Sequence, residues 1–228
     1  MTTDDTKYVL SLIREGEHLQ QDFKYRVADA VKLARSVSAF ANTCGGRLLI
    51  GVRDDGHISG VRSEEEIYMM HQAAYRYCRP EASIKFETFH AAPTGVGAGG
   101  RPLAGSGLRT VVVATVPQSD RRPVCAIGDD GVRRAYIRIA DENIVATPVH
   151  IAIWREQQRP QGTMFTYGDN ERQLLASMQH GSGMTLNQIV RRSRLPRHVV
   201  VAVLARMVRY GLAACQFTEH QFLWALEK

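Results

Sequence analysis

Hydrophobic and polar positions repeat with two different periods along the first 150 residues. Apolar residues at helical spacing predict helices over 7–15, 28–42 and 63–79. Alternating or short apolar runs predict strands over 19–25, 47–52, 58–61, 83–90, 109–117 and 132–139. Because helices are followed by hairpins, the pattern favours an α+β fold with a mainly antiparallel or mixed sheet and not a doubly wound one.

The spacing is clearer in the last third of the chain. It predicts helices over 169–178, 185–191 and 197–210, and two strands over 212–217 and 221–226. Three helices followed by a β-hairpin are typical of a winged helix-turn-helix. The segment 158–168 is polar and rich in Gly and Pro, which indicates a linker. The sequence therefore predicts a first domain over 1–157 and a winged helix over 169–228.

Charge is distributed unevenly between these two parts. The chain has 228 residues and a formal net charge of +6. Residues 1–160 carry 21 basic and 19 acidic side chains, whereas residues 161–228 carry 8 basic and 4 acidic ones. Arginine outnumbers lysine by 24 to 5, and its planar fork suits phosphates and base edges. A GC-rich genome would give the same bias without any ligand, so the bias alone does not decide.

The cysteines and the hydrophobic runs indicate the cellular compartment in which the protein is expected. The four cysteines are widely spaced and form no CxxC motif, which disfavours a zinc ribbon and fits reduced thiols: Cys44, Cys78, Cys125 and Cys215. The polar start of the chain disfavours a signal peptide, and no apolar run is long enough for a membrane span. We expect a cytoplasmic protein with no membrane partner.

Three sequence blocks carry a family resemblance. Residues 17–24 (EHLQQDFK) form an acidic entry strand, and residues 38–56 (SAFANTCGGRLLIGVRDDG) form a long helix–turn–strand block. The third block runs from Arg122-Pro123-Val124 through Tyr136-Ile137-Arg138 to Asn143. Together they resemble the Schlafen AlbA-2 domain family over about residues 10 to 150. The resemblance implies a Schlafen/Alba-like mixed-sheet domain that binds nucleic acid.

The same resemblance implies a candidate catalytic site. Some eukaryotic members of this family cleave transfer RNA with three carboxylates, which match Glu17, Asp22 and Asp54 here. Such a cluster can hold Mg²⁺ or Mn²⁺, and the ion activates water and neutralises the scissile phosphate. The chain departs from the family pattern at Asp22, where the usual residue is Glu. Structural roles are the alternative: Asp54 belongs to an Asp-Asp-Gly turn, and Asp22 alternates with Lys24 on one strand face.

Basic side chains provide a second kind of candidate site. On the strand 132–139, alternation places Arg134, Tyr136 and Arg138 on one face, with Arg121 and Arg122 nearby in sequence. Arginines with an aromatic ring suit phosphate neutralisation and base stacking. The alternative is a solvated face whose arginines pair with neighbouring aspartates.

The predicted winged helix carries its own basic group. Five side chains surround the turn into its third helix, where recognition helices contact DNA: Arg191, Arg192, Arg194, Arg197 and His198. The third helix also holds more apolar residues than one small core can use, which indicates a further dimer or interdomain surface.

Three functions remain open at this point. The first is a DNA-binding regulator, expected to be a homodimer, with DNA favoured over RNA as partner and no cofactor. The second is a divalent-metal-dependent nuclease that uses the three carboxylates. The third is a nucleotide-binding first domain, with the winged helix as an interaction module.

Overall fold

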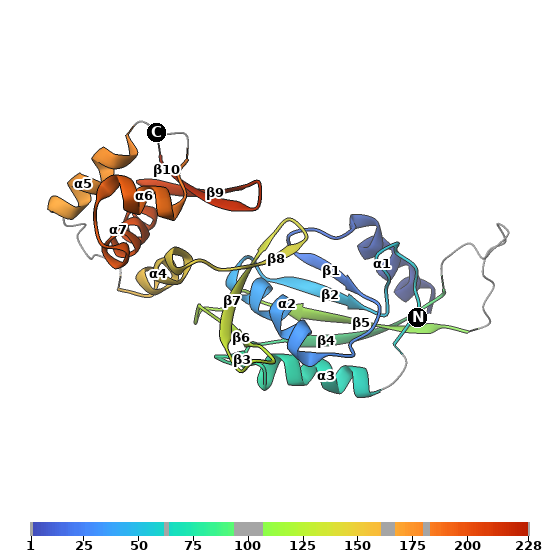
Figure 1. Cartoon of the computed structure of the whole chain (residues 1–228). Coiled ribbons are helices and arrows are strands. Elements are labelled where there is room, and N and C mark those ends of the chain that lie inside the picture. Colours follow the sequence, from blue (N-terminus) through green and yellow to red (C-terminus); the bar gives the residue numbers. More distant parts are fainter. Residues whose placement is uncertain (1, 62–63, 94–106, 161–166, 180–182, 228) are drawn as a thin grey trace. The chain divides into compact units, whose positions relative to one another are not determined.

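The computed structural model describes residues 2–61, 64–93, 107–160, 167–179 and 183–227 (Figure 1). The chain divides into two compact units, Met1–Val145 and Ala146–Lys228. Both mix helices and strands, which confirms the α+β fold class. Among the described residues, no helix combines the length and apolar character that a membrane span requires.

The main sheet of the first unit has four strands in the order β1-β2-β5-β4. Their bounds are β1 Gln21–Lys24, β2 Gly46–Ile50, β4 Lys85–Ala91 and β5 Arg109–Val116. β1 and β2 run parallel, with Asp22 opposite Leu48, and the other two pairs are antiparallel. The predicted mixed sheet is therefore confirmed.

Helices cover both faces of this sheet. Helix α1 (Thr2–Glu15) packs Val9 and Leu12 against one face. Helices α2 (Ala30–Asn42) and α3 (Glu64–Tyr75) pack against the other face, which Leu48 and Ile50 line. Because both faces are covered, three successive residues of β1 are buried.

A second sheet packs against α2 from the opposite side (Figure 1). It contains β3 (Cys78–Arg79), β6 (Cys125–Ile127), β7 (Arg133–Ile139) and β8 (Glu142–Val145), all antiparallel. Helix α2 is thus enclosed between two sheets, with most of its residues buried. Of these strands the sequence predicted only β7, because the others are too short to show a period.

One predicted hairpin is wrong. Residues 58–61 do not form a strand, and only an isolated bridge joins Val52 to Ile58. The amides of Ser59 and Gly60 both donate to the carbonyl of Gly51, which folds the segment into a tight turn.

The described residues of the second unit form four helices and one hairpin. They are α4 (Pro148–Gln157), α5 (Asp169–Met178), α6 (Leu186–Ser193), α7 (Arg197–Arg209), β9 (Ala213–Thr218) and β10 (Gln221–Leu226). The three helices and two strands predicted after residue 168 are all present. Thr185 caps α6, since its hydroxyl accepts from the Gln188 amide at 3.3 Å. Glu219 and His220 close the hairpin with φ of 51° and 57°.

Helix α4 was not foreseen as part of this unit. It packs along α7, and Val149 and Ile153 join the same core as Leu204 and Trp224. The division between the two units therefore falls before α4, at Val145 and Ala146. The linker was predicted later in the chain, at 158–168. Residues 161–166 of that segment lie outside the described residues. α4 also uses much of the apolar surface of α7 that the sequence had left for a dimer or interdomain contact.

Candidate nucleic-acid interface

Two polar residues of the longest family-like block are structural. Asn42 donates from Nδ2 to the carbonyls of Val124 (2.8 Å) and Tyr136 (2.9 Å), and its Oδ1 accepts from the Val124 amide (2.8 Å). Ser38 donates to the same Val124 carbonyl at 2.7 Å. Both side chains are buried, so they join α2 to the second sheet and do not face a ligand.

The adjoining Gly-Gly turn is also explained by the fold. Gly45 has φ of +70°, a conformation that favours glycine. Gly46 lies against the ring of Phe40, which a Cβ at this position would overlap. The first glycine is needed for its backbone conformation and the second for close packing.

Asp22 is the centre of a buried ion-pair network. Its carboxylate lies 2.7 Å from Lys24 Nζ and 3.4 Å from Arg138 Nη2, and the residue is 4% exposed. Burial raises the pKa of Asp22, but the hydrogen bond with Glu17 and the charges of Lys24 and Arg138 outweigh it, so the net pKa is lowered. Asp22 is therefore an ionised, buried carboxylate that is paired with two cations, although its Oδ2 accepts no hydrogen bond from the described residues.

Arg138 lies inside the protein and not on a surface stripe. The residue is 2% exposed, and its guanidinium lies 5.2 Å from the centre of the Phe40 ring. It also donates to Asn143 Oδ1 (3.1 Å) and to the Gln21 carbonyl (3.2 Å). The prediction that Arg138 contacts nucleic acid is wrong for this arrangement, because the face of β7 that carries it packs on α2.

Glu17 lies beside this network. Its Oε1 accepts from the Phe23 amide at 2.9 Å. Burial and the hydrogen bond with the Asp22 carboxylate raise the pKa of Glu17. Glu17 and Asp22 therefore lie side by side, as the family resemblance implied. Their carboxylates contact each other and other groups of the protein.

Asp54 does not complete a metal site with them. It is exposed in the turn after β2. Across the described ranges, no group of three or more His, Cys, Asp or Glu side chains is arranged to hold a metal ion. The Mg²⁺ or Mn²⁺ expected from the three carboxylates does not fit this geometry.

The remaining residues predicted to bind nucleic acid near β7 differ in how accessible they are to a ligand. Arg134 donates to both carboxylate oxygens of Asp130, at 3.0 and 2.7 Å, which holds the pKa of Asp130 at about 2. Tyr136 packs against the main core. Arg121 is exposed and Arg122 is half-buried. The predicted stripe is therefore broken up, and Arg121 is its most accessible member.

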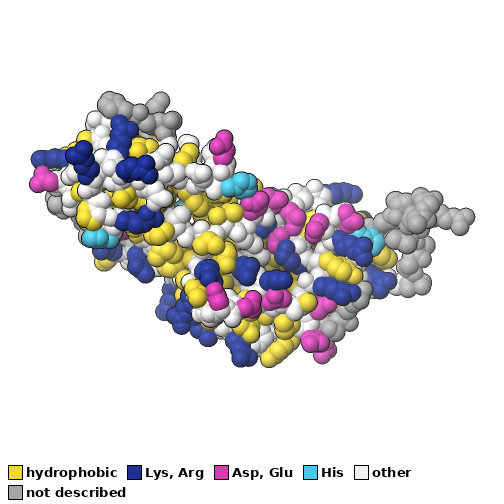
Figure 2. Space-filling model, in the orientation of Figure 1, with side chains coloured by type: hydrophobic (Ala, Val, Ile, Leu, Met, Phe, Trp, Pro, Cys, Tyr) yellow, Lys and Arg dark blue, Asp and Glu magenta, His cyan; other side chains and the backbone are white. Residues whose placement is uncertain are grey.

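The basic group of the second unit is fully on the surface. Its members all lie at the end of α6, in the following turn or at the start of α7, and all are exposed: Arg191, Arg192, Arg194, Arg197 and His198. Arg197 donates to Asn187 Oδ1 at 2.6 Å. Within the described part of the chain none of these arginines has an acidic partner. On the face drawn in Figure 2, this unit shows Lys and Arg side chains with few acidic neighbours, whereas the first unit mixes both signs.

Two other arginines of α7 have structural roles. Arg206 pairs with Glu171 of α5, and Arg209 donates to the Glu156 carbonyl at the end of α4. The cations of α7 therefore divide by position: those at its C-terminal end hold the unit together, and those at its N-terminal end are exposed and have no acidic partner among the described residues. A hollow of about 410 Å³ adjoins the free end, bordered by Asn187, Arg197 and Gln221 of the hairpin.

Arg194 has an unusual backbone. It ends α6 in the left-handed region with φ of 56°. An arginine there is less favourable than a glycine, which is common at this position in helix ends.

A further basic group was missed by the sequence analysis. Arg26 and Arg53 stack on the ring of Tyr25, with guanidinium carbons 5.1 and 4.8 Å from its centre. Both arginines are exposed. They come from segments 27 residues apart, so no local pattern could have grouped them. Stacking holds the guanidinium planes in place and leaves their N–H groups available for phosphates.

Comparison with known proteins gives one family match. The family described as Schlafen, AlbA_2 matches residues 17–147, which is more than half of the chain. No match was found among curated proteins. A crystal structure of the DIP2311 protein from Corynebacterium diphtheriae aligns with a TM-score of 0.42 and 20% sequence identity, over 82% of this chain and 31% of that one. This chain thus spans about a third of the length of that protein.

Proposed function

This chain belongs to the Schlafen AlbA_2 family, and from that premise we propose that it is a DNA-binding regulator whose second unit is a winged helix. The single observation that carries the proposal is the group of exposed arginines at the turn between α6 and α7, which have no acidic partner among the described residues. In a helix-turn-helix this turn opens the recognition helix, whose first residues contact base edges and phosphates.

The arrangement of the second unit supports this assignment. Helices α5, α6 and α7 followed by the β9–β10 hairpin have the order of a winged helix-turn-helix. Arg197 and His198 begin α7 and would contact the major groove. Arg191, Arg192 and Arg194 precede them and would neutralise backbone phosphates. The hollow beside Arg197 and Gln221 gives a strand of the duplex a concave surface between helix and hairpin.

The first unit contributes a second basic surface in this proposal. The stacked pair Arg26 and Arg53 offers preorganised phosphate donors on a domain of a nucleic-acid-binding family. A nuclease is less well supported, because Asp22 is engaged with Lys24 and Arg138 and Asp54 lies in an exposed turn.

A salt-dependent binding measurement tests the proposal. Fluorescence anisotropy would give the affinity of the full chain for a labelled duplex DNA and for a structured RNA between 50 and 300 mM salt. In this range phosphate contacts dominate the slope of log affinity against log salt concentration. We expect tighter binding to DNA and a steep loss of affinity with salt. The triple variant Arg191→Ala/Arg192→Ala/Arg194→Ala should weaken DNA binding about a hundredfold and lower the salt slope by about 3.

The matched control removes the same charge elsewhere. Arg14, Arg109 and Arg133 are exposed residues of the first unit, and their triple alanine variant should bind DNA within about threefold of the unaltered protein. Equal losses for both triple variants would reduce the interaction to net charge and overturn the recognition-helix assignment. RNA bound more tightly than DNA would overturn the choice of partner.

The homodimer stays part of the proposal. Tyr210 and Leu212 are exposed at the end of α7 and give the second unit an apolar surface for self-association. Sedimentation of the free protein should give twice the chain mass of 25.4 kDa.

A further inference from the structure

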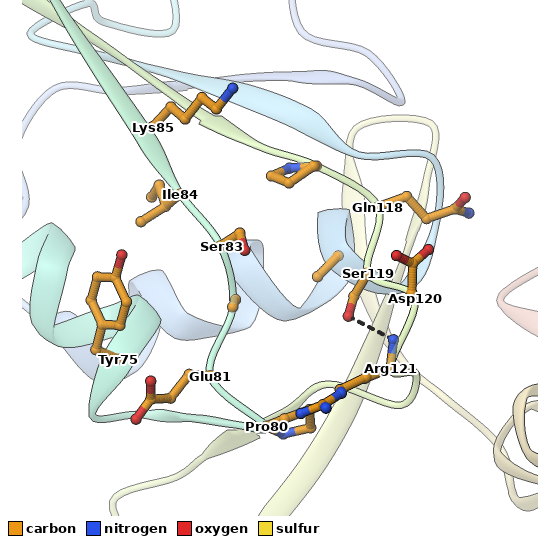
Figure 3. A pocket seen from close by; sticks show the side chains of 13 residues that line it. Tyr75, Pro80, Glu81, Ser83, Ile84, Lys85, Gln118, Ser119, Asp120 and Arg121 are labelled. Atoms are coloured by element: carbon orange, nitrogen blue, oxygen red, sulfur yellow. Dashed lines mark hydrogen bonds between the residues drawn. The ribbon is translucent and has the colours of Figure 1, made fainter.

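One hollow of the first unit is not used by the function proposed above. It has a volume of about 880 Å³ and lies between the start of β4 and the loop that follows β5 (Figure 3). Its volume falls within the range of small-molecule sites in proteins.

The hollow has an apolar floor. Ala41, Ala82 and Ile84 line it and are buried, and Pro80 and Pro117 add apolar surface at its sides. The loop that forms one wall is fixed, since the Ser119 amide donates to the Ala41 carbonyl at 2.8 Å and the Ser119 hydroxyl accepts from the Arg121 amide at 3.1 Å. This wall is therefore held in place by hydrogen bonds within the protein.

An aromatic ring forms the opposite wall. Tyr75 ends α3, is 44% exposed and faces the hollow from the side away from Asp120 (Figure 3). His71 stacks on Tyr75 one helical turn earlier, with ring centres 5.9 Å apart. A ring held in this way gives a surface on which a planar group can stack.

Four charged side chains surround the opening. Lys85 and Arg121 are the cations, and Glu81 and Asp120 are the anions. All four are exposed, and within the described ranges none forms an ion pair with another or with any other residue. Lys85 and Arg121 lie at opposite ends of the hollow in Figure 3. The gap between them is therefore open to a ligand that carries both an anionic group and hydrogen-bond donors.

We propose that this hollow binds a nucleotide whose base carries an exocyclic amino group. The base would lie over the apolar floor beside Tyr75, and its amino group would donate to Asp120 or Glu81. Lys85 or Arg121 would bind the phosphate. A carboxylate accepts from the cytosine amino group but meets another acceptor, an oxygen, at the same position on uracil, so the two bases are distinguished by hydrogen-bond donor and acceptor and not by size.

This inference rests on the proposed function in one respect: the ligand is a nucleotide, which is the unit of a nucleic acid. The same chemistry can come from a free mononucleotide or from the end of a single strand. The hollow and the α6–α7 arginines belong to different units, so each can fail without the other.

The test is calorimetric titration of the full chain with cytidine monophosphate and, as the matched ligand, uridine monophosphate. We expect cytidine monophosphate to bind about tenfold more tightly. The variant Arg121→Ala/Lys85→Ala should weaken binding about tenfold or more, whereas Arg133→Ala, outside the hollow, should leave it unchanged. Tyr75→Phe should retain affinity because it retains the ring, and Tyr75→Ala should lose it several-fold.

The difference in affinity between cytidine and uridine monophosphate tests the role of the two carboxylates separately. In Glu81→Gln/Asp120→Asn the two mononucleotides should bind within about twofold of each other. A short oligocytidine that binds the same variants in parallel, but tighter than the mononucleotide, would identify a strand as the source; equal affinity would identify the free nucleotide. No saturable binding of either mononucleotide, or binding unaffected by Arg121→Ala/Lys85→Ala, overturns the site. The Arg191→Ala/Arg192→Ala/Arg194→Ala variant should bind cytidine monophosphate normally.

Discussion

Arg138 and the arginines of the α6–α7 turn are the same side chain in opposite environments. Arg138 is 2% exposed and holds Asp22, Asn143 and a backbone carbonyl, so that its charge joins β7 to β1. Arg191, Arg192 and Arg194 are exposed and have no acidic partner in the described part of the chain. The difference teaches that burial and pairing, and not charge alone, decide whether an arginine supports the fold or is available to a ligand.

The largest expected effect comes from breaking the buried pair. Arg138→Met should lower the free energy of unfolding of the first unit by about 3–5 kcal/mol, because Asp22 loses its main buried partner while remaining desolvated. Urea denaturation followed by far-ultraviolet circular dichroism measures this loss.

Two further variants sharpen that measurement. Asp22→Asn/Arg138→Met should recover roughly half of the lost stability, because no unpaired charge stays buried. Arg133→Met changes an exposed arginine of the same strand and should shift stability by less than about 0.5 kcal/mol. Equal losses at positions 133 and 138 would contradict the assigned difference between the two arginines.

The second effect concerns a half-buried titratable group in the second unit, His150. His150 packs against Phe222 and Trp224, and burial lowers its pKa to about 4 from 6.5. The unfolded chain therefore takes up a proton below pH 6.5 that the folded unit does not bind until about pH 4. Stability is fully present above pH 6.5 and is lost as pH falls, by about 2 kcal/mol between pH 7.5 and 5.

Tryptophan fluorescence can follow this change in the second unit alone, because Trp154 and Trp224 are the two tryptophans of the chain. The variant His150→Gln should flatten the dependence between pH 7.5 and 5. The same slope in the variant and the unaltered protein would assign the effect to other groups.

The smallest effect separates stability from binding at one exposed arginine. Arg194→Gly should raise the free energy of unfolding of the second unit by about 0.5–1 kcal/mol, because glycine adopts a φ of 56° more readily. The same change should weaken DNA binding about threefold to tenfold through one lost phosphate contact. Denaturation and anisotropy on one protein sample measure both. A variant that is less stable and binds unchanged would contradict the functional role of Arg194.

The sequence predicted the second unit better than the first. Helices α5, α6 and α7 and both hairpin strands were found because each is long enough to show its period, and the Thr185 cap is local. The short strands β3, β6 and β8 have too few residues for a pattern. Helix α4 was missed as a neighbour of α7, since that contact joins segments far apart in the chain.

The candidate sites show the same limit. The exposed arginines of the α6–α7 turn are adjacent in sequence and could be grouped from it. The stacking of Arg26 and Arg53 on Tyr25, and the hollow between β4 and the loop after β5, depend on contacts between distant segments. The strand alternation that grouped Arg134, Tyr136 and Arg138 was read correctly as one face, but nothing local indicated that α2 covers it.

The sequence by itself determined the α+β class, the family and the basic character of the second unit, because these follow from local spacing, motif and composition. Only the tertiary structure decided which charges are inside. Burial and pairing depend on where distant segments meet: the contact of β7 with α2 turned Arg138 from a candidate ligand contact into part of the core, whereas no segment among the described residues buries Arg191, Arg192 and Arg194.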